Sequence, residues 1–145
     1  MKIFISHSFK DKSIALLLAN FLENISPDID VFCSSIQGSI MVGKDYVDFI
    51  ILSLKCSDIF IPILSENYFD SKFCMIELGF AYSYLYLHNK SDEYILPFAI
   101  PPVKKFAALS HSPLQNLQVG ELCDKNDVHG FLNYLREKKC QIRRE

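Results

Sequence analysis

The 145-residue chain contains no tryptophan, no Cys-x-x-Cys pair and no long uninterrupted apolar segment. Its five cysteines are an odd number and lie far apart, which argues against a disulfide framework and against a zinc site, and favours reduced thiols. The apolar stretch Ile3–Ile5 is too short for a signal peptide, and the run from Ile14 to Leu22 is too short to span a bilayer. We therefore expect a cytoplasmic protein without a membrane partner.

The charge balance also excludes some partners. The formal net charge is −2, so the chain gives no electrostatic reason to expect nucleic acid or an anionic membrane as a ligand. Half of the residues are hydrophobic, and the length suits one domain with a real core. We expect residues 1–145 to form a single domain, which a longer protein would carry at its N-terminus.

Segments typical of strands and helices alternate along the chain. The expected strands are Lys2–Ser6, Asp30–Cys33, Asp58–Leu64, Tyr94–Ile100 and, in a region that is hard to interpret, Leu117–Val119. The expected helices are Asp11–Asn24, Lys44–Lys55, one that follows a cap at Asp70 or Ser71, and Val128–Lys139 with Asn126 or Asp127 as its cap. This order predicts an α/β fold: a flavodoxin-like three-layer sandwich whose central, mostly parallel five-stranded sheet has helices on both faces.

Two local patterns make sharper predictions. The apolar face of the first helix is predicted to comprise Ile14, Leu17, Leu18, Phe21, Leu22 and Ile25. Pro62 lies inside the most apolar strand, where it predicts that the strand ladder ends or becomes irregular, because proline has no N–H to donate.

Glu77 is the charge that most needs an explanation. With 3.6 residues per turn, it shares a stripe with Phe73, Phe80, Ala81 and Tyr84, and it is the only charge in that stripe. A buried carboxylate is costly, and is usually retained for a partner or for chemistry. The plain structural alternative is an ion pair with Lys72 or Lys104.

The expected topology brings polar segments together near Glu77. In open α/β sheets a ligand site lies at the carboxyl ends of the strands. Here those ends are Ser6–Phe9, Cys33–Ser35 and the Ser65–Ser71 segment that leads to Glu77. Glu77 is therefore expected on an element that starts at the functional edge.

The motifs at these ends resemble a known family. Residues Ile3–Ser8 (Ile-Phe-Ile-Ser-His-Ser), followed by Lys10-Asp11, are similar to the first box of Toll/interleukin-1 receptor (TIR) domains. Residues 65–68 (Ser-Glu-Asn-Tyr) and 73–78 (Phe-Cys-Met-Ile-Glu-Leu) resemble the family's Ser-x-x-Tyr and Trp-Cys-x-x-Glu-Leu elements, with Phe73 in place of the tryptophan. The Arg-Asp-x-x-Pro-Gly loop of receptor-type members is absent, and the late Phe-Trp box is at best Phe131. These departures favour the enzymatic, prokaryote-like members.

The resemblance implies cleavage of the nicotinamide–ribose bond of NAD, as substrate, with Glu77 as the catalytic residue and without a metal or other cofactor. It implies substrate contacts from Ser6, His7, Ser8, Ser34, Lys44 and Phe73. Water as the attacking group gives ADP-ribose, whereas an adenine nitrogen gives a cyclic isomer, and the sequence does not decide between them. The resemblance further implies a role in antiviral or cell-death defence, and self-association through the loop from Ser34 to Gly43.

Other interpretations stay open. A non-catalytic TIR interaction module would not need Glu77, and a nucleoside deoxyribosyltransferase-like enzyme would use a glutamate on deoxynucleosides. A phosphate-accepting receiver domain ranks last, because the first strand ends without acidic residues. Among single residues, Phe73 taken alone is more often a core residue than a ligand contact, Ser8 with Asp11 resembles a capping box, and Cys74 is expected to be a small buried hydrophobe.

Overall fold

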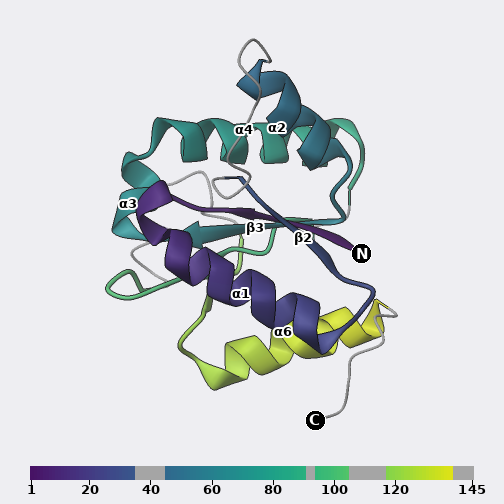
Figure 1. Ribbon diagram of the computed structural model, residues 1–145, viewed down its shortest axis with the longest axis vertical. Coiled ribbons are helices and arrows are strands. Elements are labelled where there is room, and N and C mark those ends of the chain that lie inside the picture. Colours follow the sequence, from purple (N-terminus) through teal and green to yellow (C-terminus); the bar gives the residue numbers. More distant parts are fainter. Residues whose placement is uncertain (35–44, 91–93, 105–116, 139–145) are drawn as a thin grey trace.

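The computed structural model describes residues 1–34, 45–90, 94–104 and 117–138 (Figure 1). Its strands are β1 (Lys2–Ser6), β2 (Asp30–Cys33), β3 (Ile59–Leu64), β4 (Phe98–Ala99) and β5 (Gly120–Glu121). Its helices are the 3-10 helix η1 (Phe9–Asp11), α1 (Lys12–Ile25), α2 (Tyr46–Lys55), α3 (Glu66–Asp70), α4 (Lys72–Leu87) and α6 (Lys125–Glu137). The strands form one sheet in the order β2-β1-β3-β4-β5, and every pair is parallel.

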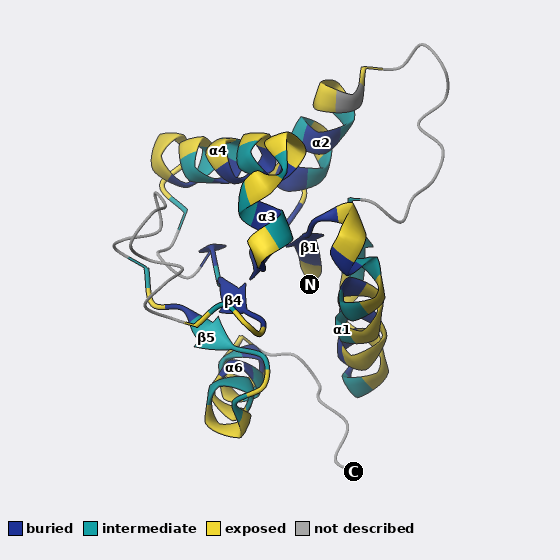
Figure 2. Cartoon of the chain, turned by 90° about the vertical axis from the view of Figure 1, so that its left-hand side faces the viewer, coloured by how far each residue is buried: buried dark blue, intermediate teal, exposed yellow. Residues whose placement is uncertain are grey.

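Helices cover both faces of this sheet, as the sequence predicts. Helices α2 and α4 lie on one side and α1 and α6 on the other (Figure 1 and, turned by 90°, Figure 2). Alternate residues of β1 point to opposite faces: Phe4 joins the core beneath α2 and α4, whereas Ile3 and Ile5 join the core beneath α1 and α6. The even-numbered position Ser6 therefore belongs to the α4 side, which matters for the site below.

Strand β3 changes partners at Pro62. Residues Ile59 to Pro62 are in register with β1, ending at the pair Ser6↔Pro62, and Ile63 and Leu64 are in register with β4. The ladder with β1 thus ends at the proline, while the strand itself continues for two more residues. The predicted interruption is confirmed for one edge of the strand only.

The face that α1 presents to the sheet is narrower than its apolar pattern. The buried positions are Ala15, Ala19 and Leu22, whereas Leu17 and Phe21 of the predicted apolar face are exposed. Ile14, Leu18 and Ile25 are partly buried and pack against the same core.

The C-terminal part differs most from expectation. The fourth strand is only Phe98–Ala99, with an isolated bridge at Ile95, and the fifth is Gly120–Glu121 rather than Leu117–Val119. Helix α6 starts three residues earlier than predicted, because Asp124 caps it by accepting hydrogen bonds from the backbone N–H groups of Asn126 and Asp127.

The four described cysteines divide into two groups. Cys33 and Cys74 are buried thiols, whereas Cys56 and Cys123 are exposed, so the expectation of mostly buried thiols holds for two of the four. Among the helices that the structure describes, none has both the length and the apolar composition that crossing a bilayer requires.

Candidate active site

A cavity of about 440 Å³ lies at the carboxyl end of β1. Its lining residues come from all three segments that the sequence predicts to meet: His7, Phe9, Ser34, Ser71, Phe73, Cys74 and Glu77. In the strand order 2-1-3-4-5, chain direction across the sheet reverses between β1 and β3, and open α/β sheets bind ligands at such a switch point. The predicted convergence at this edge is therefore present in the structure.

Glu77 is a buried carboxylate in the wall of this cavity. It is 2% exposed, and it lies on the inner face of α4 together with Cys74, Leu78, Ala81 and Leu85. Ser71 starts the helix by accepting a hydrogen bond from the backbone N–H of Cys74, so one of the two predicted caps is confirmed. Lys72 and Lys104, the alternative partners, are exposed.

The inner face of α4 is rotated by about one residue from the predicted stripe. Phe73 is 61% exposed, while its neighbour Cys74 is buried. The short helix α3, which sequence reasoning took as part of a loop, packs against α4 and sets its direction of entry. Phe73 therefore lies at the cavity surface rather than in the core.

Ser6 lies behind Glu77 rather than in the cavity wall. Its side chain is fully buried, its hydroxyl donates a hydrogen bond of 2.5 Å to Glu77 Oε2, and the Tyr68 hydroxyl is 3.0 Å away. The sequence suggested a direct substrate contact for Ser6. The geometry instead gives Ser6 a supporting contact to the carboxylate.

His7 reaches the cavity with a defined tautomer. Its Nδ1 lies 2.8 Å from the carbonyl oxygen of Ser8, and a carbonyl only accepts, so Nδ1 carries the proton. Burial lowers the pKa of His7, although the Ser8 carbonyl and the Asp11 carboxylate oppose that shift. The ring is thus neutral at pH 7, with Nε2 as an acceptor nitrogen.

Ser8 and Asp11 have structural contacts. Ser8 caps η1 through the backbone N–H of Lys10, which agrees with the capping alternative for Ser8. The buried Asp11 carboxylate accepts hydrogen bonds from the Ser65 hydroxyl and from Asn67 Nδ2 at 3.4 Å. Asp11 therefore attaches the start of α3 to the start of α1.

The remaining predicted contacts divide as follows. Ser34 is half-buried and lines the cavity, whereas Lys44 and the rest of the 34–43 loop lie outside the described residues. Burial raises the pKa of the Cys74 thiol to about 12, so this cavity residue stays protonated and is a poor nucleophile. Within the described residues, no group of three or more His, Cys, Asp or Glu side chains is arranged to hold a metal ion.

Sequence reasoning missed two residues of the site. Phe9 is 73% exposed and lines the same cavity as Phe73. Its signal was a large apolar residue directly after the polar end of the first strand. Tyr68 was noted only as part of a motif, and its contact with Ser6 spans 62 residues of sequence, which no local pattern reveals.

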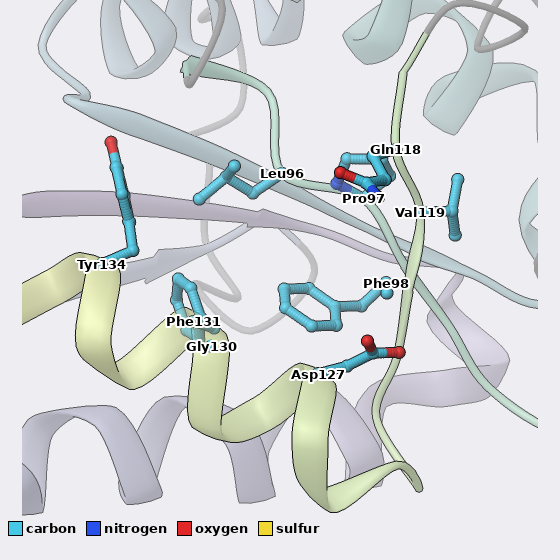
Figure 3. Close-up of a pocket in the computed structure, with 10 residues that line it drawn as sticks. Leu96, Pro97, Phe98, Gln118, Val119, Asp127, Gly130, Phe131 and Tyr134 are labelled. Carbon is cyan, nitrogen blue, oxygen red and sulfur yellow. The ribbon is translucent and has the colours of Figure 1, made fainter.

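A second cavity, of about 360 Å³, lies between the β4–β5 edge and α6 (Figure 3). Phe98 and Phe131 form its floor, with ring centroids 5.3 Å apart, and Asp127 lies at one end. The Asp127 carboxylate accepts a hydrogen bond from the backbone N–H of Glu121 at 2.9 Å, and so joins α6 to β5. We assign this cavity a structural origin, because a glycine at position 130 leaves the helix surface open there.

The structure is similar to solved TIR domains. The TIR domain of the Toll-related receptor TRR-2 from Hydra magnipapillata matches with a TM-score of 0.67 and 20% identity, over 94% of this chain and 95% of that one. The TIR domains of the activated Roq1 resistosome, which directly recognizes the pathogen effector XopQ, match with a TM-score of 0.66 and 16% identity, over 94% and 98%. A prokaryotic SEFIR domain matches with a TM-score of 0.55 and 20% identity, over 94% and 90%. At these identities the likeness concerns the fold.

A sequence relative is found in Bacillus subtilis (strain 168). The uncharacterized protein YddK is 34% identical over 99 residues, which cover 66% of this chain and 36% of YddK. The match therefore spans about a third of that relative.

The family model described as "TIR domain" matches residues 3–133, from β1 into α6. This range contains every residue of the cavity, including the Glu77 helix whose motif suggested the family. The chain belongs to the TIR domain family.

Proposed function

We propose that this TIR domain cleaves the nicotinamide–ribose bond of NAD, with Glu77 as the catalytic residue. The observation that carries the proposal is a carboxylate, 2% exposed, in the wall of a cavity of about 440 Å³ at the ligand-binding edge of a parallel sheet. The buried Asp11 carboxylate is placed differently: it bonds to Ser65 and Asn67 and does not line this cavity. Glu77 accepts a hydrogen bond from Ser6 and, in addition, lines the cavity.

One carboxylate is enough for this reaction. Ordinary glycosidases need a second carboxyl group to protonate the leaving oxygen. Nicotinamide needs no such acid. Its ring is cationic while it is bonded to ribose, and it leaves as a neutral base because it takes the electron pair of the broken C–N bond. Glu77 would accept hydrogen bonds from the ribose hydroxyls and stabilise the positive charge that develops on the sugar.

The cavity has walls that suit such a substrate. Phe9 and Phe73 offer exposed aromatic rings, and a planar base stacks favourably on such rings. Ser34 offers a hydroxyl, and neutral His7 offers an imidazole, for contacts with ribose or phosphate. Lys44 remains a proposed substrate contact.

The direct test is to incubate the purified protein with NAD and to separate the nucleotides by chromatography. Wild type is expected to release nicotinamide, and Glu77→Gln to release none. The matched control is Glu66→Gln, which makes the same change at an exposed carboxylate on α3 and is expected to keep full activity. Equal activity in wild type and Glu77→Gln would refute the catalytic role.

The same chromatogram identifies the reaction class. ADP-ribose indicates water as the attacking group, and a cyclic isomer indicates an adenine nitrogen. A parallel incubation with deoxynucleosides tests the deoxyribosyltransferase alternative, which predicts base exchange there and no change in NAD.

We further propose that the domain acts in the cytoplasm, in antiviral or cell-death defence, and that self-association through the 34–43 loop activates it. Specific activity is then expected to rise with protein concentration, together with molar mass in light scattering. An associating protein that leaves NAD intact at every concentration would instead support the interaction module.

A further inference from the structure

Glu77 is the end of a chain of buried hydroxyl groups. The Ser6 hydroxyl donates to Glu77 Oε2 at 2.5 Å, and the Tyr68 hydroxyl lies 3.0 Å from Ser6 Oγ. Both Ser6 and Tyr68 are 0% exposed, and neither lines the cavity that contains Glu77. Their polar atoms therefore serve the carboxylate rather than a ligand.

The order of donors in this chain of hydrogen bonds follows from counting hydroxyl protons. A serine hydroxyl has one proton, and that of Ser6 is donated to Glu77. The contact between Ser6 and Tyr68 must then use the proton of the phenol. Burial raises the pKa of Tyr68 well above its ordinary value, so that proton is retained. The order of donation is Tyr68 to Ser6 to Glu77.

Tyr68 is itself fixed from a second direction. Its backbone N–H donates to Ser65 Oγ at 3.0 Å, and the Ser65 hydroxyl donates to the buried Asp11 carboxylate. Helix α3 is thereby attached to the start of α1, and the phenol is placed beside the end of β1. This support explains how a five-residue helix holds a hydroxyl in one position.

We propose that Tyr68 and Ser6 are positioning residues that hold Glu77 in its reactive orientation and keep it ionised inside a buried site. The proposal rests on the proposed function of Glu77. A hydrogen bond from a hydroxyl to a carboxylate at this distance is charge-assisted and strong. The second hydroxyl strengthens the first bond, because a serine hydroxyl that accepts a hydrogen bond is a better hydrogen-bond donor.

The kinetic test uses Tyr68→Phe, which removes one oxygen and keeps the ring. Its matched control is Tyr94→Phe: Tyr94 is also fully buried, but its hydroxyl donates to the carbonyl of Leu54 at 3.2 Å. We expect kcat for NAD to fall about 10-fold in Tyr68→Phe with KM within about twofold, and both constants to be kept in Tyr94→Phe. Equal losses in both variants would overturn the proposal.

A double mutant tests whether the hydroxyls act as one unit. If Tyr68 acts on Glu77 only through Ser6, then Ser6→Ala and Ser6→Ala/Tyr68→Phe have the same kcat. If the losses in kcat of the two single variants multiply in the double variant, Tyr68 acts independently of Ser6, and the proposed chain of hydrogen bonds is refuted. Urea unfolding of each variant establishes that the compared proteins are folded.

A titration separates failure of this proposal from failure of the proposed function. Glu77 is followed by the carboxyl carbon signal that Glu77→Gln lacks, with no substrate present. We expect the titration midpoint to move to higher pH in Tyr68→Phe and to stay in Tyr94→Phe, because the ionised form loses support. A shifted midpoint in a protein that leaves NAD intact would keep the positioning role and reject the enzyme. An unchanged midpoint would overturn the positioning role.

The surroundings of Glu77 make this titration interpretable. Among the described residues, Tyr68 on α3 and Cys74 on α4 interact electrostatically with Glu77, His7 lines the same cavity, and burial favours the neutral form of all three. Asp11 is a further buried carboxylate, which acts electrostatically on Cys74 and His7. The charged residues of α2, which also packs against α4, are exposed: Asp45, Asp48 and Lys55.

Discussion

The ring of Phe98 occupies the space that a side chain at position 120 would need. A Cβ atom on Gly120 would lie 2.7 Å from Phe98 Cε1, closer than such atoms approach in proteins. Phe98 is buried and packs edge-on against Phe131, which limits how far its ring can move. The pairing of β4 with β5 therefore depends on a residue without a side chain.

We predict that Gly120→Ala destabilises the fold by about 1–3 kcal/mol, as overpacking does. Gly130→Ala is the control: it lies inside α6 with nothing within 4 Å of the added atom, and alanine should stabilise the helix by about 1 kcal/mol. Urea unfolding measures the free energy of unfolding, which should fall in Gly120→Ala and rise in Gly130→Ala. A neutral Gly120→Ala would mean that β5 readily shifts away from Phe98.

Removing the Asp11 carboxylate should weaken the attachment of α3. In Asp11→Ala the buried Ser65 hydroxyl loses its acceptor, and an unsatisfied buried polar group costs about 1–3 kcal/mol. Asp70→Ala, at an exposed aspartate that ends α3, should change the free energy of unfolding by less than about 0.5 kcal/mol. Similar midpoints in urea for the two variants would contradict this role of Asp11.

His7 should make the protein less stable in acid. Burial lowers the pKa of His7 below its ordinary value of 6.5, so the unfolded chain takes up a proton before the folded one. The contribution to stability is complete above about pH 6.5 and is lost as the pH falls from there towards the folded pKa.

His7→Asn tests this prediction, because the asparagine amide can still donate to the Ser8 carbonyl. The free energy of unfolding should fall less between about pH 7 and pH 5 in the variant than in wild type. His88 and His129 are exposed and present in both proteins, so their effects cancel in the comparison. If the free energy of unfolding changes with pH in the same way in both proteins, His7 does not contribute to the loss of stability in acid.

Phe9 should contribute to substrate binding if the cavity takes NAD. Loss of a ring that stacks on a base costs about 1–3 kcal/mol, so Phe9→Ala should raise KM about 10-fold and change kcat little. Leu17→Ala, at an equally exposed apolar residue of α1 outside this cavity, is the control. An unchanged KM in Phe9→Ala, in steady-state assays of nicotinamide release, would exclude the stacking role.

The sequence predicted the parts of this molecule that side-chain patterns encode. The strands β1, β2 and β3 have strong apolar runs, and their bounds lie within one residue of those predicted. Strand β5 consists of two half-buried residues that pair through their backbones, so no pattern distinguishes them from Leu117–Val119. The cap of α6 was misplaced because Asp124, Asn126 and Asp127 are all good capping residues, and only the structure shows which backbone N–H groups need one.

The same distinction applies to the site. Glu77 stood out because it is a charge on an apolar helix, and its burial confirms that anomaly. Tyr68 did not stand out, because a tyrosine among apolar residues is ordinary. Its role depends on which group its hydroxyl contacts in the folded protein. Lys44 and most of the 34–43 loop lie outside the described residues, so their predicted contacts stay predictions.

The bond from Ser6 to Glu77 joins positions 71 residues apart, across two complete strand–helix units. A contact of such long range requires the intervening chain to be brought together, which costs loop-closure entropy. If Glu77 cleaves NAD as proposed, the serine that orients its carboxylate is beside it only when β1 and α4 are both in place, so an incompletely folded chain should leave NAD intact.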